Sequence, residues 1–314
     1  MLHCESVFFW PDLLFVNRST CQGRFTIYDK SFYCVHLILK EKYNIVLSLH
    51  HQSGACYGHF VTDILPKFCL IPNYFYTSFI FLLNKKPNQR RFVNEAYNIL
   101  GIPDQNLLQL QDHAIYAQKA IFFETGECIF PNPFILNKFR FYVSVFFNLD
   151  HESSSKYIFF NRYLSHTKLH RRILNFDELY LLSEKNFNNI KFDLINDILN
   201  FSILQQAHSF NKYKFLFAVD GAALGNSFFM QKNTLIIEVL HSSIDCYTGF
   251  LNVAMSFNRF FIAARDANIL YKKNSPNTFS ASLFFKLINL GLQKLKHEKA
   301  KTNLFIFSSN ISSI

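Results

Sequence analysis

The amino-acid sequence predicts an α/β protein whose second half contains a parallel β-sheet. Three short apolar runs, YIFF (157–160), FLFAV (215–219) and TLIIEV (234–239), are typical of strands that are buried on both faces. Segments with helical periodicity lie between them, at 175–186 and 193–213. An alternation of strand, helix, strand, helix and strand favours βαβ units, and therefore a parallel sheet covered by helices.

The helical segments of the second half carry their own start signals and apolar faces. In NFDELYLLSEKN, Asn175 stands at the N-cap position and Glu178 follows three residues later, which is the spacing of a capping box. Segment 193–213 is long enough for one or two helices. Near the C-terminus, apolar residues at helical spacing predict a helix over 279–300, and we expect it to pack back on the first domain.

The first half of the sequence mixes strands with helices. Residues 1–50 alternate aromatic and polar positions around turn signals, which indicates short strands or hairpins. Residues 60–71 have a helical periodicity that a proline interrupts. Residues 90–103 predict a helix closed by Gly101, and residues 107–124 predict short strands.

A linker separates the two halves. The stretch FNLDHESSSK (147–156) is polar and serine-rich, and it lies between two aromatic runs. It divides the chain into an N-terminal α/β domain, residues 1–150, and a C-terminal α/β domain, residues 151–314. Each domain is large enough to bury a core of its own.

The composition is that of a globular protein. Half of the 314 residues are hydrophobic and 18% are aromatic, which excludes a disordered chain. Seven cysteines without a CxxC pair fit neither a disulfide framework nor a zinc ribbon, so we expect reduced thiols. Neither a signal peptide nor an apolar run of about 20 residues is evident in the sequence. We therefore expect a cytoplasmic protein.

The net charge of +10 points to an anionic partner, which could be nucleic acid, a membrane surface or a phosphorylated small molecule. Nucleic-acid binding would intersperse aromatic residues with Lys and Arg on one surface, whereas the Phe residues here fall in apolar runs. We therefore expect no nucleic acid among the partners. Peripheral membrane association through the basic surface stays open as an alternative.

Small residues gather where the second apolar run ends. In AVDGAALGNSFF, Asp220 and Gly221 close the run, and the stretch from Ala222 to Asn226 contains little bulk. If 215–219 is a parallel strand, this turn lies at its carboxyl end and opens the next helix, where α/β sheets bind ligands. Backbone N–H groups at such a helix start favour a phosphate. The alternative is a turn whose small residues serve packing alone.

Arginines occupy the corresponding place after the first apolar run of the second half. Arg162 follows YIFF directly, and Arg171 and Arg172 precede the helix predicted at 175–186. Guanidinium groups at the carboxyl end of a strand suit bidentate contacts to a diphosphate. Taken singly, each of these arginines is more often surface charge.

The stretch HHQSGACYGHFVTD gathers potential acid–base groups in the first half, namely His50, His51, Cys56, His59 and Asp63. Its spacing is irregular for a metal site, and we expect no metal. His59 and Asp63 are four residues apart, so on a helix they share a face on which the pair can serve acid–base catalysis. The motifs GxSxG, Walker A and GxGxxG do not occur in the sequence.

Several of these stretches together resemble the catalytic domain of glycosyltransferase family 61. The stretches NRYLSHTKLHRRILNFDEL, FSILQQAHSF and VDGAALGNSFFMQKNTLIIEV follow one another in the order typical of that family. The stretch GHFVTDILPKF is similar to the segment that precedes them in the family. The resemblance covers roughly residues 55–70 and 157–240.

The resemblance implies a GT-B-like fold, in which two Rossmann-like domains face a cleft. The N-terminal domain would lie on the acceptor side, and the C-terminal domain would bind the nucleotide-sugar. The implied reaction is an inverting, metal-independent transfer of a sugar from a nucleotide-sugar, such as a UDP-sugar, to a hydroxyl of a glycan or protein acceptor. No further cofactor is implied, and polysaccharide biosynthesis is a typical setting for such enzymes.

The resemblance also implies roles for individual residues. Arg162 and Arg172 would contact the diphosphate, and Glu238 would lie near the ribose or support its site. The implied catalytic residues are His59 and Asp63, and the implied donor-binding residues are Arg162, Arg172, Gln206, Asp220, Gly221, Ala222, Asn226 and Glu238.

The sequence departs from the family pattern at two positions. Asp220 stands where the family has His, and Gly225 stands where it has Thr. A carboxylate beside a diphosphate is electrostatically unfavourable unless a cation neutralises it. Either the site is rewired, with Arg162 or Arg172 paired to Asp220, or the chain is a catalytically degenerate GT-B scaffold. Such a scaffold would act as a carbohydrate-binding or partner subunit.

Overall fold

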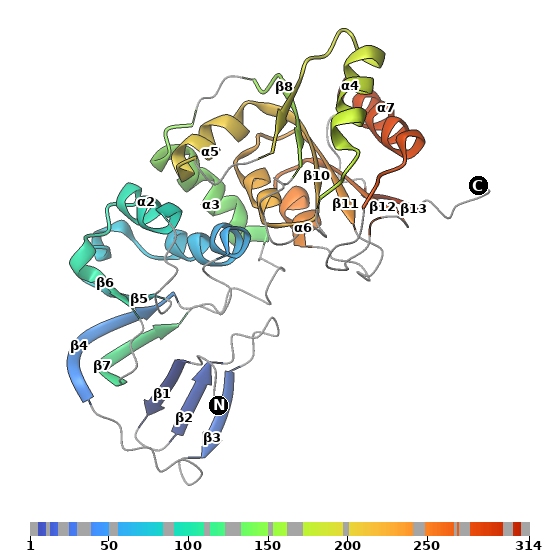
Figure 1. The fold of residues 1–314 in the computed structure, drawn as a ribbon. Coiled ribbons are helices and arrows are strands. Elements are labelled where there is room, and N and C mark those ends of the chain that lie inside the picture. The colour runs from blue at the N-terminus through green and yellow to red at the C-terminus, as the bar shows by residue number, and fades with distance from the viewer. Residues whose placement is uncertain are drawn as a thin grey trace. The chain divides into compact units, whose positions relative to one another are not determined.

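A computed structural model of the chain describes residues 6–10, 13–17, 25–29, 39–49, 56–83, 91–109, 114–122, 133–149, 153–161, 172–196, 201–240, 249–266, 269, 277–297 and 304–308 (Figure 1). The chain divides into two compact units, residues 1–142 and 143–314. This division falls within helix α3 (Pro133–Phe146), whereas the sequence predicts it at the linker near residue 150. The domain boundary at 150 therefore stays a prediction.

The described residues of the first unit form two sheets. One is antiparallel, as the alternating pattern of residues 1–50 predicts, and consists of β1 (Ser6–Trp10), β2 (Leu13–Asn17) and β3 (Phe25–Asp29). The other is parallel and has the strand order β6-β5-β4-β7. Its strands are β4 (Leu39–Ser48), β5 (Ile80–Leu83), β6 (Leu107–Gln109) and β7 (Ala114–Phe122). The chain therefore adds β5 and β6 on one side of β4 and returns to its other side with β7.

A continuous helical run lies between β4 and β5. Its parts are α1 (Tyr57–His59), the π-helical η2 (Phe60–Ile64) and the 3₁₀-helical η3 (Leu65–Leu70). A proline lies in the first turn of η3, where its missing N–H and fixed φ are tolerated. Phe60 and Phe68 are fully buried, and their ring centroids lie 5.8 and 5.6 Å from that of Tyr97. The helical segment predicted from the periodicity is thus confirmed.

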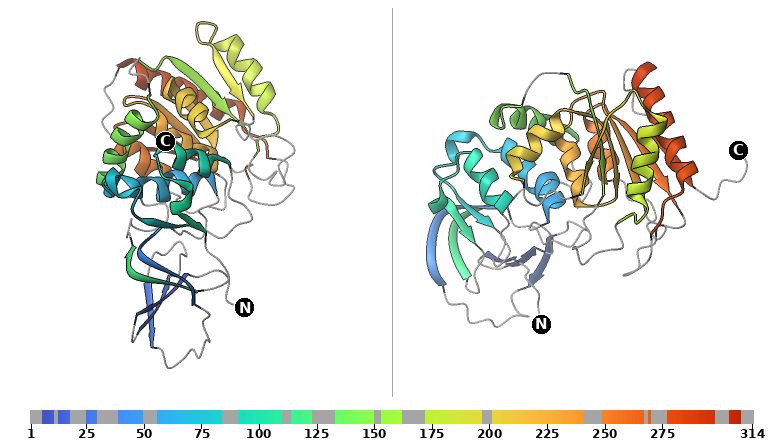
Figure 2. Two further views of the ribbon diagram at one scale, coloured as in Figure 1. Left: turned by 90° about the vertical axis from the view of Figure 1, so that its left-hand side faces the viewer. Right: turned by 45° about the horizontal axis from the view of Figure 1, so that its top comes forward.

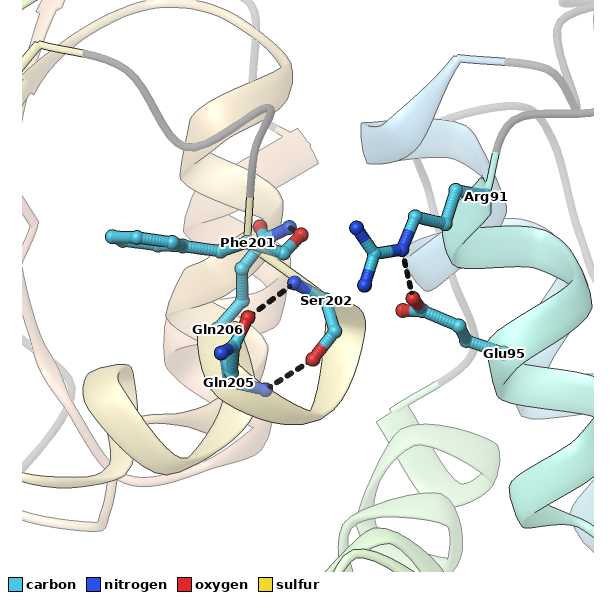
Figure 3. Close-up of polar contacts among 6 residues, drawn as sticks. All are labelled: Arg91, Glu95, Phe201, Ser202, Gln205 and Gln206. Atoms are coloured by element: carbon cyan, nitrogen blue, oxygen red, sulfur yellow. Dashed lines mark hydrogen bonds and ion pairs between the residues drawn. The ribbon is translucent and has the colours of Figure 1, made fainter.

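Helix α2 (Arg91–Ile99) confirms the helix predicted over residues 90–103. Gly101 ends it with a φ of 74°, a left-handed conformation in which the following N–H groups return to the last carbonyls of the helix. On its surface, Arg91 and Glu95 form an ion pair one turn apart (Figure 3). Because both partners reach solvent, this pair contributes little to stability.

The second unit is built on six described strands, which pair in parallel in the order β13-β12-β11-β10-β8-β9. The three apolar runs of the sequence form β8, β10 and β11, as predicted. The start of segment 193–213 is an edge strand, β9, and the segment therefore contains a single described helix. The strands are β8 (Lys156–Phe160), β9 (Phe192–Ile195), β10 (Tyr213–Val219), β11 (Leu235–Leu240), β12 (Phe260–Arg265) and β13 (Leu304–Ser308).

Helices cover both faces of this sheet (Figures 1 and 2). One face carries α4 (Phe176–Asn186) and α7 (Ala281–His297), which contact each other. The other carries α5 (Ile203–Asn211), the 3₁₀ helix η7 (Ala222–Phe229) and α6 (Gly249–Ser256). A parallel sheet between two helical layers is a Rossmann-like arrangement, so the α/β prediction is confirmed. The GT-B arrangement of two domains around a cleft stays a prediction.

Phenylalanine dominates the core between the sheet and the layer of α4 and α7. Phe159 of β8 stacks on Phe192 of β9, with ring centroids 4.3 Å apart. Phe284 of α7 meets Phe159 and Phe217 of β10 edge-on, at 5.5 and 5.0 Å. Each fully buried ring of this kind contributes about 1.5–3 kcal/mol of hydrophobic stabilisation. The high Phe content therefore serves the core.

The capping box lies on a different helix from the one predicted. Asn175 precedes α4, but its side chain makes no cap with Glu178; it forms two hydrogen bonds to the backbone of Phe279, of 3.0 and 2.9 Å. The prediction was wrong because this side chain ties α4 to the segment before α7. The capping box belongs to α5, where Ser202 Oγ accepts from the Gln205 N–H at 3.0 Å and Gln205 Oε1 accepts from the Ser202 N–H at 2.8 Å (Figure 3).

Helix α7 confirms the C-terminal helix predicted over residues 279–300, as far as those residues are described. The face that carries Phe284, Leu287 and Ile288 is fully buried against the sheet of its own unit. Its packing on the first domain stays a prediction. Among the described residues, no helix is both long and apolar enough to cross a membrane.

Replacing Gly291 of α7 with Leu should destabilise the fold. A β-carbon at this position would overlap Leu235 Cδ2, and it would lie 3.4 Å from Ile237 Cδ1 and Phe215 Cε2. Overpacking of this kind costs about 1–3 kcal/mol, so the melting temperature should fall by several degrees. Asn289→Leu, at an exposed position of the same helix, is the matched control. Equal melting temperatures of the two variants would contradict this packing.

Candidate functional site

The carboxyl edge of the six-stranded sheet contains the point at which the chain changes direction across the sheet. After β8 the chain adds β9 on one side, then crosses over and adds β10, β11, β12 and β13 on the other. Doubly wound sheets bind ligands at such a switch point, beside the carboxyl ends of the two diverging strands. Here these strands are β8 and β10, and the residues that follow them are Asn161 and Asp220.

Asn161 holds Arg172 at this edge. Its side-chain amide donates to the carbonyl oxygen of Ile173 at 2.9 Å, and its Oδ1 accepts from the Ile173 N–H at 3.1 Å. Arg172 directly precedes Ile173, and its side chain is buried. The structure thus places Arg172 beside the end of β8, while Arg162 and Arg171 lie outside the described residues. The contact of Arg172 with a diphosphate stays a prediction.

The backbone at Gly221 adopts a conformation that only glycine tolerates readily. Its φ of 154° and ψ of 179° lie in a region that a β-carbon makes unfavourable. The chain turns there from β10 into η7, which begins with Ala222, and the Leu224 N–H donates to the Gly221 carbonyl at 3.0 Å. The predicted helix start after the strand is therefore present, in 3₁₀ form. Gly221 therefore allows the backbone to change direction sharply between β10 and η7.

Gln206 and Asn226, both predicted from the resemblance, contact each other. Asn226 Nδ2 donates to Gln206 Oε1 at 3.0 Å, and Gln206 Nε2 donates to the Phe201 carbonyl at 3.2 Å (Figure 3 shows Phe201 and Gln206). Both amide side chains are buried where α5 packs on η7. This pair fixes the position of η7, and with it the turn at Gly221. Direct contact of either residue with a nucleotide stays a prediction.

Asp220 and Glu238 form a buried pair of carboxyl groups. Ala218 of β10 is the register partner of Glu238 of β11, and the Asp220 N–H continues this pairing by donating to the Val239 carbonyl at 2.9 Å. Because side chains alternate along a strand, Ala218, Asp220 and Glu238 project from the same face of the sheet. Glu238 is 0% exposed and Asp220 is 4% exposed.

This environment favours the protonated form of Glu238. Burial raises its pKa well above the usual range, and the negative charge of Asp220 and a hydrogen bond with Asp220 raise it further. Neither oxygen of Glu238 accepts a hydrogen bond from a described donor, so an ionised Glu238 would be a buried charge without compensation. The protonated group can instead donate to Asp220. The pair then carries one negative charge between two carboxyl groups.

Arg259, which the sequence analysis did not single out, anchors the far end of η7. Its Nε donates to the Gln231 carbonyl at 3.0 Å, and its Nη2 donates to the carbonyls of Phe228 and Met230. The guanidinium carbon also lies 4.6 Å from the ring centroid of Phe257. An arginine that is almost fully buried and donates to three carbonyls at the end of a helix stabilises that end. In the sequence, the available signal for this role is a single Arg directly before an apolar run.

The first unit carries the predicted acid–base pair on the helical run after β4. His59 Nδ1 lies 2.7 Å from Asp63 Oδ2, with the imidazole 20% exposed and the carboxylate 7% exposed. The hydroxyl of Thr62 lies 2.9 Å from Asp63 Oδ1 and 2.9 Å from the Gly58 carbonyl. An ionised Asp63 is an acceptor, so it places the imidazole proton on Nδ1 and leaves Nε2 as the basic nitrogen. This geometry suits a general base.

The part of the chain that the structure describes contains no group of three or more His, Cys, Asp or Glu side chains that could hold a metal ion. His50 and His51 lie outside that part. The expectation that transfer needs no metal is a separate matter, and it stays a prediction.

The fold is that of a Rossmann-like α/β protein. Polar groups lie at the switch point of its sheet, where proteins of this class bind ligands. The chain belongs to glycosyltransferase family 61, because the family model described as Glycosyltransferase 61 matches residues 57–237, more than half of the chain. The resemblance seen in the sequence is thereby confirmed, and membership implies glycosyltransferase activity in general terms. A search of curated proteins found no match.

The family match covers both candidate sites. It begins with Tyr57 at the start of α1 and ends with Ile237 in β11, so it spans the acid–base pair and the turn at Gly221. The match stops one residue before Glu238. The carboxyl pair therefore joins one residue inside the matched segment to one just beyond it.

Replacing Glu238 with Gln should change how stability depends on pH. The raised pKa means that, above a pH of about 4.5, the folded protein holds a proton that the unfolded chain has released. The free energy of unfolding of the wild type should therefore fall as the pH rises through this window, by up to about 1.4 kcal/mol per pH unit. Gln is neutral and keeps a donor toward Asp220, so this contribution should disappear.

The measurement is chemical denaturation of both proteins between pH 5 and pH 8, with Glu178→Gln on the exposed surface of α4 as the matched control. The control should retain the pH dependence of the wild type. If Glu238→Gln also retains it, Glu238 is not protonated in the folded protein.

Proposed function

We propose that this protein is an inverting glycosyltransferase that moves a sugar from a nucleotide-sugar, a UDP-sugar in our proposal, to a hydroxyl of a glycan or protein acceptor. The observation that carries the proposal is the family match across residues 57–237, which spans both the turn at Gly221 and the His59–Asp63 pair. Neither feature alone would define a reaction. Together they provide a binding element for an anion and a base for a hydroxyl.

The donor diphosphate would bind at the carboxyl edge of β8 and β10. The N–H groups at the start of η7, beginning with Ala222, are the donors that a phosphate accepts from, and Gly221 lets it approach the backbone. Arg172 would add a charge-assisted bidentate contact, and Arg162 would add a second cation. Arginines and backbone N–H groups can neutralise the leaving diphosphate, which is why we propose a reaction without metal.

The acceptor hydroxyl would be activated by His59. The Nε2 atom accepts the proton as the hydroxyl oxygen bonds to the anomeric carbon, and the bond from that carbon to the diphosphate breaks on the opposite face. The configuration at the anomeric carbon is inverted by this displacement. Asp63 Oδ2, which lies 2.7 Å from Nδ1, accepts a hydrogen bond from the Nδ1 proton and stabilises the imidazolium that forms.

A degenerate scaffold is the second candidate function, and Asp220 is the observation that favours it. A carboxylate in place of the family's histidine adds negative charge where the diphosphate would bind. A protein of that kind would retain the fold and bind a carbohydrate or a partner without transferring sugar. The two functions differ in turnover, so both binding and transfer need to be measured.

Nucleotide-sugar binding should be detectable as a rise in melting temperature. A ligand at a hundred times its Kd adds about 2.7 kcal/mol to the free energy of unfolding, so a screen of UDP-, GDP- and CMP-sugars should single out one nucleotide. Arg172→Ala should weaken binding of that nucleotide roughly tenfold to hundredfold, because a charge-assisted contact contributes about 1.5–3 kcal/mol.

Arg171→Ala is the control for this experiment, since it removes the same charge one residue earlier and should leave affinity nearly unchanged. Circular dichroism establishes that both variants are folded. Equal affinities of the two variants would remove Arg172 from the donor site.

Loss of the base should reduce transfer without reducing donor affinity. We expect His59→Gln to lower the transfer rate by about 10²–10⁴-fold, the usual contribution of a general base. The Kd for the nucleotide-sugar should stay as in the wild type, because the proposed donor site lies on the second unit. His208→Gln on α5 is the control substitution.

A His59→Gln protein with an undiminished transfer rate would exclude this base. A wild-type protein that binds a nucleotide-sugar but shows no turnover with any acceptor would favour the degenerate scaffold.

A further inference from the structure

The backbone that follows Arg172 is bound to other elements at each of the next three residues. At the first, Ile173 exchanges two hydrogen bonds with the side chain of Asn161 at the end of β8. At the second, the Leu174 N–H donates at 2.8 Å to the first carbonyl of residues 277–280, the segment that directly precedes α7. The stretch after Arg172 is therefore held between the end of a strand and a segment about a hundred residues later in the chain.

At the third residue, the side chain of Asn175 makes the connection. Its Nδ2 donates to the Phe279 carbonyl at 3.0 Å, and its Oδ1 accepts from the Phe279 N–H at 2.9 Å. Because the two bonds use both ends of one amide, they fix the distance between the two backbone stretches and also their orientation. Phe279 is itself held in place, since it is 1% exposed and its ring meets that of Phe217 of β10 edge-on at 5.9 Å.

The segment 277–280 is also bound to the end of β12. Asp266 directly follows β12 and is buried, and its Oδ2 accepts from the Ser280 N–H at 2.9 Å. The hydroxyl of Ser280 accepts in turn from the Leu283 N–H at 3.4 Å, as an N-cap of α7 does. The segment therefore starts a helix and is at the same time attached to the sheet.

Together these bonds connect the ends of β8 and β12 at the carboxyl edge of the sheet. Strands β10 and β11 lie between those two strands, and Phe279 in the middle of the connection packs on β10. Helices α4 and α7, which follow the two connected stretches, contact each other on the same face of the sheet (Figure 1). The family match ends at residue 237, so the segment 277–280 lies beyond it.

We propose that Asn175 is a positioning residue of the proposed donor site: by binding Phe279, it fixes the stretch 173–175 and thereby places the guanidinium of Arg172 for the diphosphate. The proposal rests on the proposed function in one respect, the contact of Arg172 with the diphosphate. The placement of Arg172 itself concerns contacts within the second unit and can be measured without a ligand.

The physical reason is the entropy of a long side chain. An arginine that binds a diphosphate through two N–H groups must give up much of its rotamer freedom, and a mobile backbone beneath it would add to that cost. The bonds from Asn161 fix Ile173 alone. Without Asn175, the Phe279 N–H and carbonyl would lose their side-chain partner inside the fold, which favours a shift of either stretch until they are paired again.

Arginine NMR of Asn175→Ala tests the placement of Arg172 without a ligand. In protein labelled with ¹⁵N-arginine, the Nε–H signal of Arg172 is assigned by its absence from Arg172→Ala. A buried side chain held in one position gives a distinct signal whose proton exchanges slowly with water. We expect Asn175→Ala to move this signal toward those of exposed arginines and to speed its exchange about tenfold. An unchanged signal would overturn the proposal.

Asn175→Asp is the second variant, for the case that Asn175→Ala does not fold. Aspartate has the same shape and keeps an oxygen that accepts from the Phe279 N–H, but in its ionised form it cannot donate to the Phe279 carbonyl. The Arg172 signal should change in the same direction by a smaller amount. An unchanged signal in this variant counts against the proposal in the same way.

Affinity for UDP tests whether Asn175 acts through Arg172. Asn175→Ala should weaken UDP binding roughly threefold to tenfold, the range that corresponds to the loss of a neutral hydrogen bond. In an Arg172→Ala background, the same substitution should change affinity by less than about twofold, because the side chain that it positions is gone. A purely structural role would lower the melting temperature and give the same loss of affinity, or none, in both backgrounds, and that result would refute the proposal.

Asn186→Ala is the matched control. Asn186 ends α4, and its Nδ2 donates to the Leu182 carbonyl at 2.7 Å. The substitution removes a bond between an asparagine side chain and the backbone from the same helix, at the end opposite Asn175. Both the Arg172 signal and the affinity for UDP should stay as in the wild type. Changes as large as those of Asn175→Ala would mean that any loosening of α4 suffices, and Asn175 would have no specific role.

The two proposals can fail separately. If the Arg172 signal responds as expected but Arg172→Ala binds UDP as tightly as the wild type, the positioning is retained and the donor role of Arg172 is rejected. If Arg172→Ala weakens UDP binding but the Arg172 signal ignores Asn175→Ala, the donor site is retained and the positioning is rejected.

Discussion

The parallel pairing of β10 with β8 and β11 is the constraint on which the candidate donor site depends. This pairing brings the ends of the strands to one edge, where Asn161 and Asp220 follow β8 and β10. It also sets the faces, because the register that opposes Ala218 to Glu238 directs Asp220 to the same side as Glu238. A slip of one residue would turn Asp220 toward the core of phenylalanines behind the sheet. The apolar residues on both faces of β10 oppose such a slip and thereby fix the polar groups at its end.

Two buried ionisable groups of the second unit are accommodated in different ways. Burial and the negative charge of Asp220 raise the pKa of Glu238 and favour its neutral form, whereas Arg259 donates to carbonyls at the end of η7. The common cause is the loss of hydration, which leaves a buried ion unstable unless a specific partner is present. Glu238 is paired in register with Ala218 of β10, two residues before Asp220, and Arg259 holds the end of η7, the helix that begins after Gly221.

The sequence predicted the fold where the signal was local and strong. Continuous apolar runs marked β8, β10 and β11, and small residues marked the turn at Gly221, because burial on both faces and a sharp turn each restrict residue type.

Strand β9 was missed, since its four residues alternate at the edge of the sheet and resemble part of a helix. The bond between Gln206 and Asn226 joins residues 20 apart, and the role of Asn175 depends on Phe279. Such contacts arise from packing and leave no pattern in the chain.

The presence of Asp220 is a weaker argument for a degenerate scaffold in the structure than in the sequence. In the sequence, an additional carboxylate stands beside the expected diphosphate. In the structure, that carboxylate lies beside Glu238, whose pKa is raised by burial and by the negative charge of Asp220, so a second negative charge at this place is disfavoured. Around it, Gly221 turns the chain from β10 into η7, and the hydrogen bond between Gln206 and Asn226 holds η7 in place. Under the proposed function, these features and the His59–Asp63 pair on the other unit favour a rewired site over a degenerate scaffold as the explanation of Asp220.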